Sequence, residues 1–138
     1  MKKSLSLFIL ISFVLTFPVL AEGKELEARQ KVAVKYFEKL TIGDIETANE
    51  LVTTPYTLDL KKVLNTKEEV FEFHKKMLSK KGKRDIPKYT CKVTDDAIKL
   101  DPKVFPPYTP FRIEIKGNGK LYIYVSNKEV PKILGFAD

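Results

Sequence analysis

The pattern of apolar and polar residues after residue 21 first predicts two amphipathic helices that meet at a corner. Between residues 24 and 41, apolar side chains recur at helical spacing on one arc, and charged side chains occupy the opposite arc. Gly43 suits the left-handed residue that ends a helix, and Asp44 can cap a second, short helix that runs to about Val52. The apolar arc of the first helix consists of Leu26, Ala28, Val32, Ala33, Tyr36, Phe37 and Leu40.

A strand and a third helix follow this corner. Residues 53–55, Thr-Thr-Pro, are expected to stop the second helix, and residues 56–63 alternate as a half-buried strand does. The stretch Thr66-Lys67-Glu68-Glu69 has the pattern of a capping box and predicts a third helix from there to about Lys80, ended by Gly82. The inward arc of this helix contains Val70, Phe71, Phe73, His74, Met77 and Leu78.

The remaining chain has the pattern of strands. Residues 89–94 alternate, the proline-rich stretch 101–110 is expected to be a connection, and residues 111–126 predict a β-hairpin. A three-residue loop, 117–119, keeps the apolar faces of the hairpin together. In that register the partners are Ile115 with Leu121, Ile113 with Ile123, and Phe111 with Val125. A last strand is expected over about residues 131–136.

The other face of this hairpin carries two tyrosines, Tyr122 and Tyr124, together with Arg112 and Glu114. Such an aromatic stripe is either packed between neighbouring strands or exposed as a surface for a partner. Both interpretations stay open from the sequence, and the second one leads us to consider a homodimer through the sheet face.

Residues 1–21 predict a secretory signal peptide that is cleaved after Ala21. Lys2 and Lys3 precede an apolar run from about Leu5 to Phe17, which is shorter than the roughly 20 residues of a membrane-spanning helix. The next residue is Glu22 and not Cys, so no lipid anchor is indicated. We therefore expect a secreted or periplasmic protein with one domain, residues 22–138, and no stable membrane span.

Charge and cysteine content narrow the classes of function further. The net charge is +7, and it falls to +5 when the two lysines of the signal peptide are removed. The lysines are scattered in pairs, so we expect a solvated surface and no nucleic-acid partner. Cys91 is the only cysteine and is expected to be a small core residue, and one His and one Cys do not make a zinc cluster of usual spacing. No cofactor or metal is assigned.

The order of helix, helix, strand, helix and then strands resembles the NTF2-like superfamily. The resemblance is carried by YFEKLTIGDIETANELVTTPY, LNTKEEVFEFHKKML and KEVPKILGFAD, and it spans nearly all of the chain after residue 21. It implies an α+β cone in which three N-terminal helices pack in a curved antiparallel sheet. The long first helix would lie inside the sheet, and the corner would let the second helix close one end. No strict catalytic motif accompanies these strings.

Four residues are candidates for a ligand pocket inside such a cone: His74, Tyr36, Arg29 and Asp59. His74 lies on the inward arc of the third helix, where an imidazole can act as a base or can be satisfied by one buried hydrogen bond. Tyr36 and Arg29 share a side of the first helix, and the resemblance adds that ketosteroid-isomerase-like members present a tyrosine there. Asp59 lies where enzymatic relatives often place a carboxylate, although strand alternation directs it away from the core.

These features favour an exported protein that binds a small apolar or amphipathic ligand, or a protein partner, without catalysis. The first alternative is a pocket enzyme of the isomerase or dehydratase type, with His74 as base and Tyr36 as hydrogen-bond donor. The second alternative is binding of an anionic envelope polymer or lipid by a lysine-rich surface. That surface comprises Lys75, Lys76, Lys80, Lys81, Lys83 and Arg84.

Overall fold

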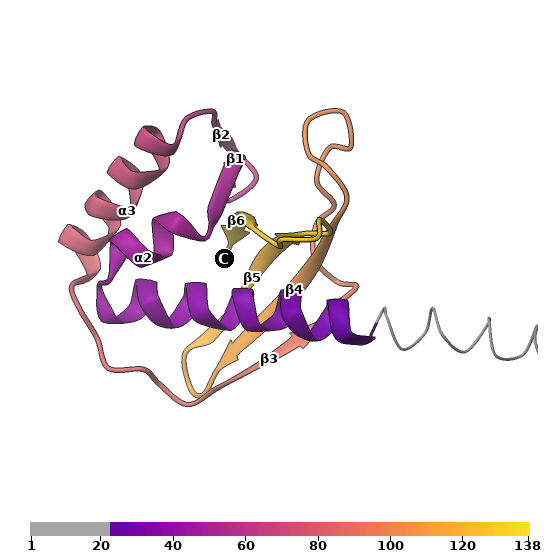
Figure 1. The fold of residues 1–138 in the computed structure, drawn as a ribbon. Helices are drawn as coiled ribbons and strands as arrows, with labels where there is room; N and C mark the ends of the chain where they lie inside the picture. The colour runs from indigo at the N-terminus through magenta and orange to yellow at the C-terminus, as the bar shows by residue number, and fades with distance from the viewer. Residues whose placement is uncertain (1–22) are drawn as a thin grey trace, which may run out of the picture.

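The first helix spans residues 23–42 and lies across one face of a six-stranded sheet in the computed structural model, which describes residues 23–138 (Figure 1). The predicted inward arc is confirmed at Ala33, Tyr36 and Phe37, which are buried, and is wrong at Ala28, which is exposed. The expected signal peptide, residues 1–21, lies outside the described residues. Within residues 23–138 no helix combines the length and the apolar character needed to cross a membrane.

The predicted corner at Gly43 and Asp44 is present. Gly43 has φ +86°, and the Asp44 carboxylate accepts a hydrogen bond of 3.2 Å from the backbone N–H of Thr47, which starts α2 (Ile45–Glu50). A Cβ atom at Gly43 would come within 2.7 Å of Cγ of Lys83. Glycine is therefore needed here both for the backbone conformation and for the packing of the segment that follows the third helix.

The single strand expected over residues 56–63 is wrong, because the structure has a hairpin there. β1 (Val52–Leu58) pairs antiparallel with β2 (Lys62–Leu64), and the chain turns between them. The expectation that residues 53–55 only end the second helix is also wrong, since they lie within β1. The turn depends on Asp59 and Leu60, whose φ angles are +49° and +63°. No Gly or Asn marks this left-handed turn, and the sequence pattern therefore did not reveal it.

The third predicted helix is confirmed as α3 (Lys67–Lys81), with Gly82 ending it at φ +73°. Oγ1 of Thr66 accepts a hydrogen bond of 3.2 Å from the backbone N–H of Glu69, as an N-cap residue should. The reciprocal bond of a capping box is displaced by one residue, because the Glu69 carboxylate accepts from the backbone N–H of Asn65 at 3.4 Å.

The sheet is mixed, and the expectation of a fully antiparallel sheet is therefore wrong. Its strand order is β2-β1-β6-β5-β4-β3, and the one parallel pair joins β1 to β6 (Ile133–Ala137). The other strands are β3 (Tyr89–Val93), β4 (Tyr108–Ile115) and β5 (Gly119–Ser126). Two strands precede α3, so the three helices do not form one N-terminal group. The α+β class is confirmed.

The hairpin of β4 and β5 has a different register from the predicted one. Ile113 pairs with Leu121 and Phe111 with Ile123, and the loop is formed by residues 116–118. The prediction was wrong by two residues. A slip of two residues keeps every side chain on its face, and the apolar pattern that guided the prediction is satisfied equally well by both registers.

Both faces of the sheet are covered. On the helix side, the larger core cluster joins the first helix, α2 and α3 to side chains such as Phe111, Ile113 and Ile123. On the opposite side, Tyr124 is fully buried with Leu100, Phe105, Leu134 and Ala137. The exposed stripe of Tyr122 and Tyr124 considered above is therefore wrong for Tyr124, because residues before β4 cover it. The homodimer through the sheet face stays a prediction.

Candidate functional site

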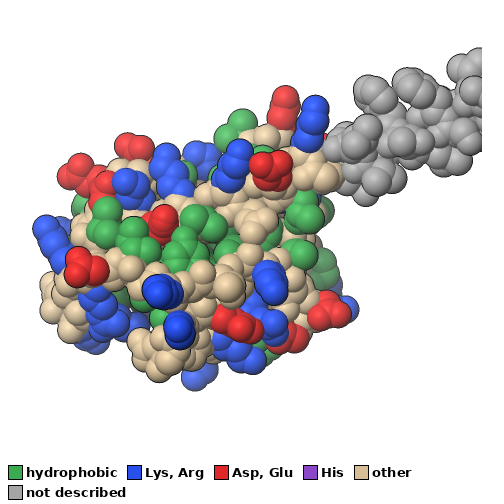
Figure 2. Space-filling model, turned by 90° about the horizontal axis from the view of Figure 1, so that it is seen from below, with side chains coloured by type: hydrophobic (Ala, Val, Ile, Leu, Met, Phe, Trp, Pro, Cys, Tyr) green, Lys and Arg blue, Asp and Glu red, His purple; other side chains and the backbone are tan. Residues whose placement is uncertain are grey.

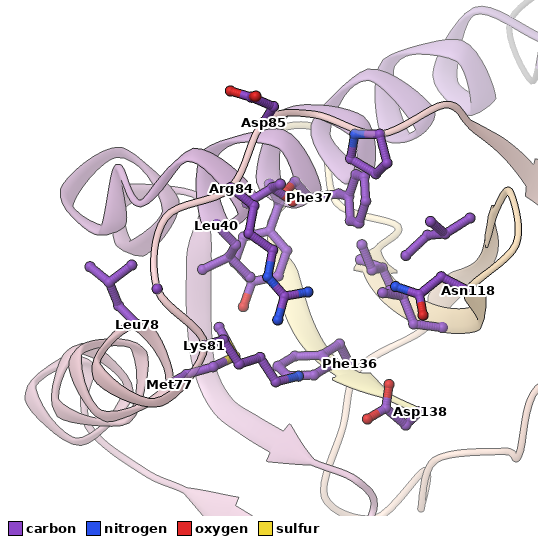
Figure 3. Close-up of a pocket in the computed structure, with 17 residues that line it drawn as sticks. Phe37, Leu40, Met77, Leu78, Lys81, Arg84, Asp85, Asn118, Phe136 and Asp138 are labelled. Atoms are coloured by element: carbon purple, nitrogen blue, oxygen red, sulfur yellow. The ribbon is translucent and has the colours of Figure 1, made fainter.

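A cavity of about 230 Å³ lies between the first helix, α3, the β4–β5 hairpin and the end of β6 (Figure 3). The first helix contributes one wall through Phe37 and Leu40, and the opposite wall includes Phe136. Most of the lining is apolar. The further apolar lining residues are Met77, Leu78, Pro87, Ile115, Leu121 and Ile123.

Tyr36 also lines this cavity, and its hydroxyl is the centre of a buried polar chain. It is hydrogen-bonded to the hydroxyl of Tyr56 at 2.5 Å and to Nε2 of His74 at 2.8 Å. The first helix supplies Tyr36, β1 supplies Tyr56 and α3 supplies His74, so the triad links three elements. All three side chains have no exposed surface. His74 itself is not among the residues that line the cavity.

The triad has more protons to donate than hydrogen bonds that use them. Two phenols and one neutral imidazole offer three protons, but only two hydrogen bonds join them. Nδ1 of His74 finds no hydrogen-bond partner among the described residues. If Tyr36 donates to His74, the unpaired donor is the imidazole N–H. If His74 donates to Tyr36, the unpaired donor is one of the two phenols, because either can donate in the bond between them. In either tautomer one buried donor stays unsatisfied, and such a donor opposes folding.

Burial controls the protonation of the triad. Loss of solvation lowers the pKa of His74 from 6.5 to about 4, so the imidazole is neutral near pH 7. Burial also raises the pKa of Tyr36 above its ordinary value, and the hydrogen bond with Tyr56 offsets part of this. The pKa of Tyr56 is raised mainly by burial and further by the neighbouring phenol. All three groups are therefore uncharged at neutral pH.

The structure brings Tyr36 and His74 together, but it places Arg29 and Asp59 elsewhere. Arg29 lies nearer the start of the first helix, where its guanidinium donates to Oγ1 of Thr109 at 3.4 Å and pairs with Glu25 at 3.3 Å. Asp59 is exposed in the β1–β2 turn. Its carboxylate accepts a hydrogen bond of 3.2 Å from the backbone N–H of Asp138, which lines the cavity, so Asp59 borders the rim without lining it.

Charged residues from the end of α3 and the segment after it surround the mouth of the cavity. Arg84 extends its guanidinium toward the middle of the space, and Lys81 runs toward Phe136 (Figure 3). Asp85 is directed away from the cavity, whereas Asp138 lies near Asn118 on the side of the hairpin. The site therefore combines an apolar interior with polar and charged groups at its rim.

A second hollow lies on the outer surface of the first helix, beside Ile86, with a volume of about 450 Å³. It is larger, but its lining comes almost entirely from one helix and includes many charged side chains. Val34, Ile42 and Ile86 supply its apolar part. Figure 2 shows the molecule from below, with a band of apolar side chains flanked by both signs of charge. We favour the first cavity because apolar side chains from several elements converge on it.

Sequence reasoning missed Tyr56 and the location of Arg84. Tyr56 lies three residues before Asp59, so the alternation that directs Asp59 away from the core directs Tyr56 toward it and did contain a signal for Tyr56. Arg84 was assigned only to the basic surface. Its place at the mouth follows from the path of residues 82–88 between α3 and β3, which no local pattern specifies.

Comparison with models of known protein families gives no match, and no curated protein sequence matches this chain. Among residues 23–138, no three His, Cys, Asp or Glu side chains come close enough together to hold a metal ion.

Proposed function

We propose that residues 22–138 form an NTF2-like domain that binds a small apolar or amphipathic ligand in the cavity beside Tyr36, after export of the protein. The observation that carries the proposal is the convergence of apolar side chains from helix, hairpin and β6 around an accessible space of about 230 Å³. Burial of apolar ligand surface there supplies the driving force for binding, at roughly 25 cal/mol per Å² of buried surface.

The NTF2-like assignment is supported by the arrangement of the elements. A long first helix lies across one face of the sheet, and a sharp corner brings a short second helix beside α3 (Figure 1). The strands change direction progressively from β1 to β4, as they do in a strongly twisted sheet. This arrangement leaves the space between helix and hairpin that the cavity occupies.

The size of the cavity limits the ligand. An apolar cavity of about 150 Å³ accommodates a benzene ring, whereas sites for drug-sized molecules begin at about 300 Å³. The present cavity lies between these values. The ligand is therefore one ring or a short alkyl chain, with any larger part outside the mouth.

The position of His74 favours ligand binding alone over catalysis of the isomerase or dehydratase type. A general base must come within hydrogen-bond reach of the proton it removes. The His74 side chain is fully buried, does not line the cavity and uses Nε2 to bond Tyr36. The triad then serves to hold the Tyr36 ring in place as part of the cavity wall.

Binding of an anionic polymer by the lysine-rich surface remains a second candidate, since its six basic residues are all exposed. Only Lys75 among them forms an ion pair within residues 23–138, with Glu72 at 3.4 Å. Salt would distinguish this mode, because attraction between exposed charges is strongly screened at physiological ionic strength. Binding of a neutral ligand such as an apolar dye in the cavity should be nearly insensitive to salt.

The proposal is tested by titrating the protein with the neutral dye phenylnaphthylamine, whose single phenyl ring meets the size limit while the naphthyl group stays at the mouth, and whose fluorescence increases in apolar surroundings. Met77→Trp fills part of the cavity, and we expect it to weaken dye binding by about tenfold, which corresponds to about 1.4 kcal/mol. The control is Val63→Trp, at a residue that is 41% exposed and outside the cavity. Absence of dye binding, or equal binding by both variants, would contradict the proposal.

A further inference from the structure

The mouth of the cavity contains an arginine whose backbone is fixed in place. The N–H of Arg84 donates to the carbonyl of Thr41 at 2.9 Å, which ties residues 82–88 to the end of the first helix. The Lys83 side chain packs against Gly43 on the same corner. The backbone of Arg84 is thus fixed by the hydrogen bond to Thr41, and the guanidinium reaches over the apolar interior (Figure 3).

Arg84 differs from the other two arginines in its charge partners. Arg29 pairs with Glu25, and Arg112 pairs with Asp96 and with Glu114, both at 2.9 Å. Within residues 23–138, neither Arg84 nor Lys81 forms an ion pair, although both line the cavity. Two positive groups therefore border the same apolar space without a bound carboxylate.

The acidic residues of the lining leave the Arg84 guanidinium accessible. Asp85 follows Arg84 in the chain but points away from the cavity (Figure 3). Asp138 lies on the side of the hairpin, and its backbone N–H is bonded to the Asp59 carboxylate at 3.2 Å. An incoming anion would meet the Arg84 guanidinium and the Lys81 ammonium at the mouth.

We infer that the ligand carries an anionic head group, a carboxylate or a phosphate, which Arg84 binds with Lys81 beside it while the apolar part enters the cavity. This inference rests on the proposed binding function and specifies its ligand class. The planar guanidinium has a fixed fork of donors that matches two oxygens of such an anion, and the Lys81 ammonium adds a second charge. The apolar lining below them excludes a purely polar anion.

The experiment compares octanoate with octanol, which share a chain length but differ in charge, by displacement of phenylnaphthylamine from the protein. We expect octanoate to bind about tenfold more tightly than octanol. Arg84→Gln keeps the backbone bond to Thr41 and should remove most of this preference, so that octanoate affinity falls about tenfold and octanol affinity stays unchanged. Lys80→Gln, which removes one charge from the same exposed surface outside the cavity, is the matched control.

The outcomes separate this inference from the function on which it rests. Equal affinity for octanoate and octanol would overturn the anionic head group and leave ligand binding intact. Failure of both compounds and of the dye would overturn ligand binding itself. An equal loss of octanoate affinity in Lys80→Gln and Arg84→Gln would also contradict the inference, because it would indicate diffuse attraction by the basic surface.

Discussion

The His74 imidazole is enclosed by Tyr36, Tyr56 and Phe73, and these neighbours explain both its hydrogen bond and its low pKa. The ring centroids lie 5.7, 6.1 and 5.8 Å from that of His74, respectively. None of these groups is charged at neutral pH, so nothing beside the ring stabilises an imidazolium. A protonated His74 would be a buried charge without a counter-ion.

His74 should therefore make the free energy of unfolding depend on pH. Its pKa in the folded protein is about 4, against 6.5 in the unfolded chain. Between these values the unfolded chain binds a proton that the folded chain does not, so stability decreases as the pH falls from 6.5 toward 4. The loss approaches roughly 1.4 kcal/mol per pH unit within this window.

Urea unfolding at several pH values between 6.5 and 4.5 would measure this dependence. That range covers the upper part of the interval between the two pKa values of His74. We expect His74→Asn to have a flatter profile than the unmodified protein, with a difference of about 2 kcal/mol accumulated over the range. Tyr56→Phe keeps the histidine and should keep the steep profile. Parallel profiles for the unmodified protein and His74→Asn would show that His74 is not buried in its neutral form.

Among the elements, β6 contributes Phe136 to the cavity because of a bulge in its pairing with β5. Val125 of β5 pairs with Ile133 and Tyr124 pairs with Gly135, so Leu134 is an extra residue on β6. Because of this bulge, Ile133 and Phe136 both pack with the core on the helix side, whereas Leu134 and Ala137 pack on the other. The bulge thereby places Phe136 in the cavity wall.

Gly135 allows β6 to approach β1 closely at this bulge. A Cβ atom there would lie 2.3 Å from the carbonyl oxygen of Thr57 and 2.5 Å from its Cγ2. Gly135→Ala must push the two strands apart, and we expect it to lower the free energy of unfolding by about 3 kcal/mol or more. Gly117→Ala is the control, since its φ is +78° but no atom lies within 4 Å of the added methyl group.

Chemical denaturation of the two glycine variants would separate steric clash from backbone strain. The cost at Gly117 should be about 1–2 kcal/mol, which reflects the left-handed conformation alone. A similar cost at Gly135 would mean that β1 and β6 tolerate the added methyl group, contrary to the close approach of Gly135 to Thr57.

The elements that the sequence predicts well are those defined by neighbours along the chain. Thr66, Gly43 and Gly82 mark helix ends through local hydrogen bonds and backbone conformation, and all three act as predicted. The β1–β6 parallel pair and the β4–β5 register depend on contacts between distant segments. A pattern with a period of two cannot distinguish registers that differ by two residues.

The candidate site was predictable to a similar extent. Helical periodicity placed Tyr36 and His74 on inward arcs, and the structure joins them. The same periodicity put Arg29 on the side of Tyr36, but it lies two turns away along a long helix and contacts Thr109 instead. The position of Arg84 depends on an irregular segment, for which side-chain periodicity carries no information.

At the scale of the whole molecule, the sheet separates two clusters that have different roles. The helix-side cluster includes Phe37 and forms part of the cavity wall. The opposite cluster includes Phe105, and the Tyr124 hydroxyl donates to the carbonyl of Ile98 at 2.8 Å, which holds the covering segment. Phe37 and Phe105 are similarly buried, with exposed fractions of 6% and 7%.

This separation predicts that stability and ligand binding can be altered independently. Phe105→Ala and Phe37→Ala should each lower the free energy of unfolding by about 3 kcal/mol, because each leaves a void of similar size in an apolar cluster. Only Phe37→Ala changes the cavity wall, so it alone should change phenylnaphthylamine affinity, by at least about fivefold, or about 1 kcal/mol. The Phe105→Ala variant should bind the dye as the unmodified protein does. Dye affinity is measured at a temperature at which both variants are folded.

If Phe105→Ala altered dye binding as much as Phe37→Ala, the two clusters would be one cooperative unit. The sheet would then not isolate the binding site from the segment on its other face.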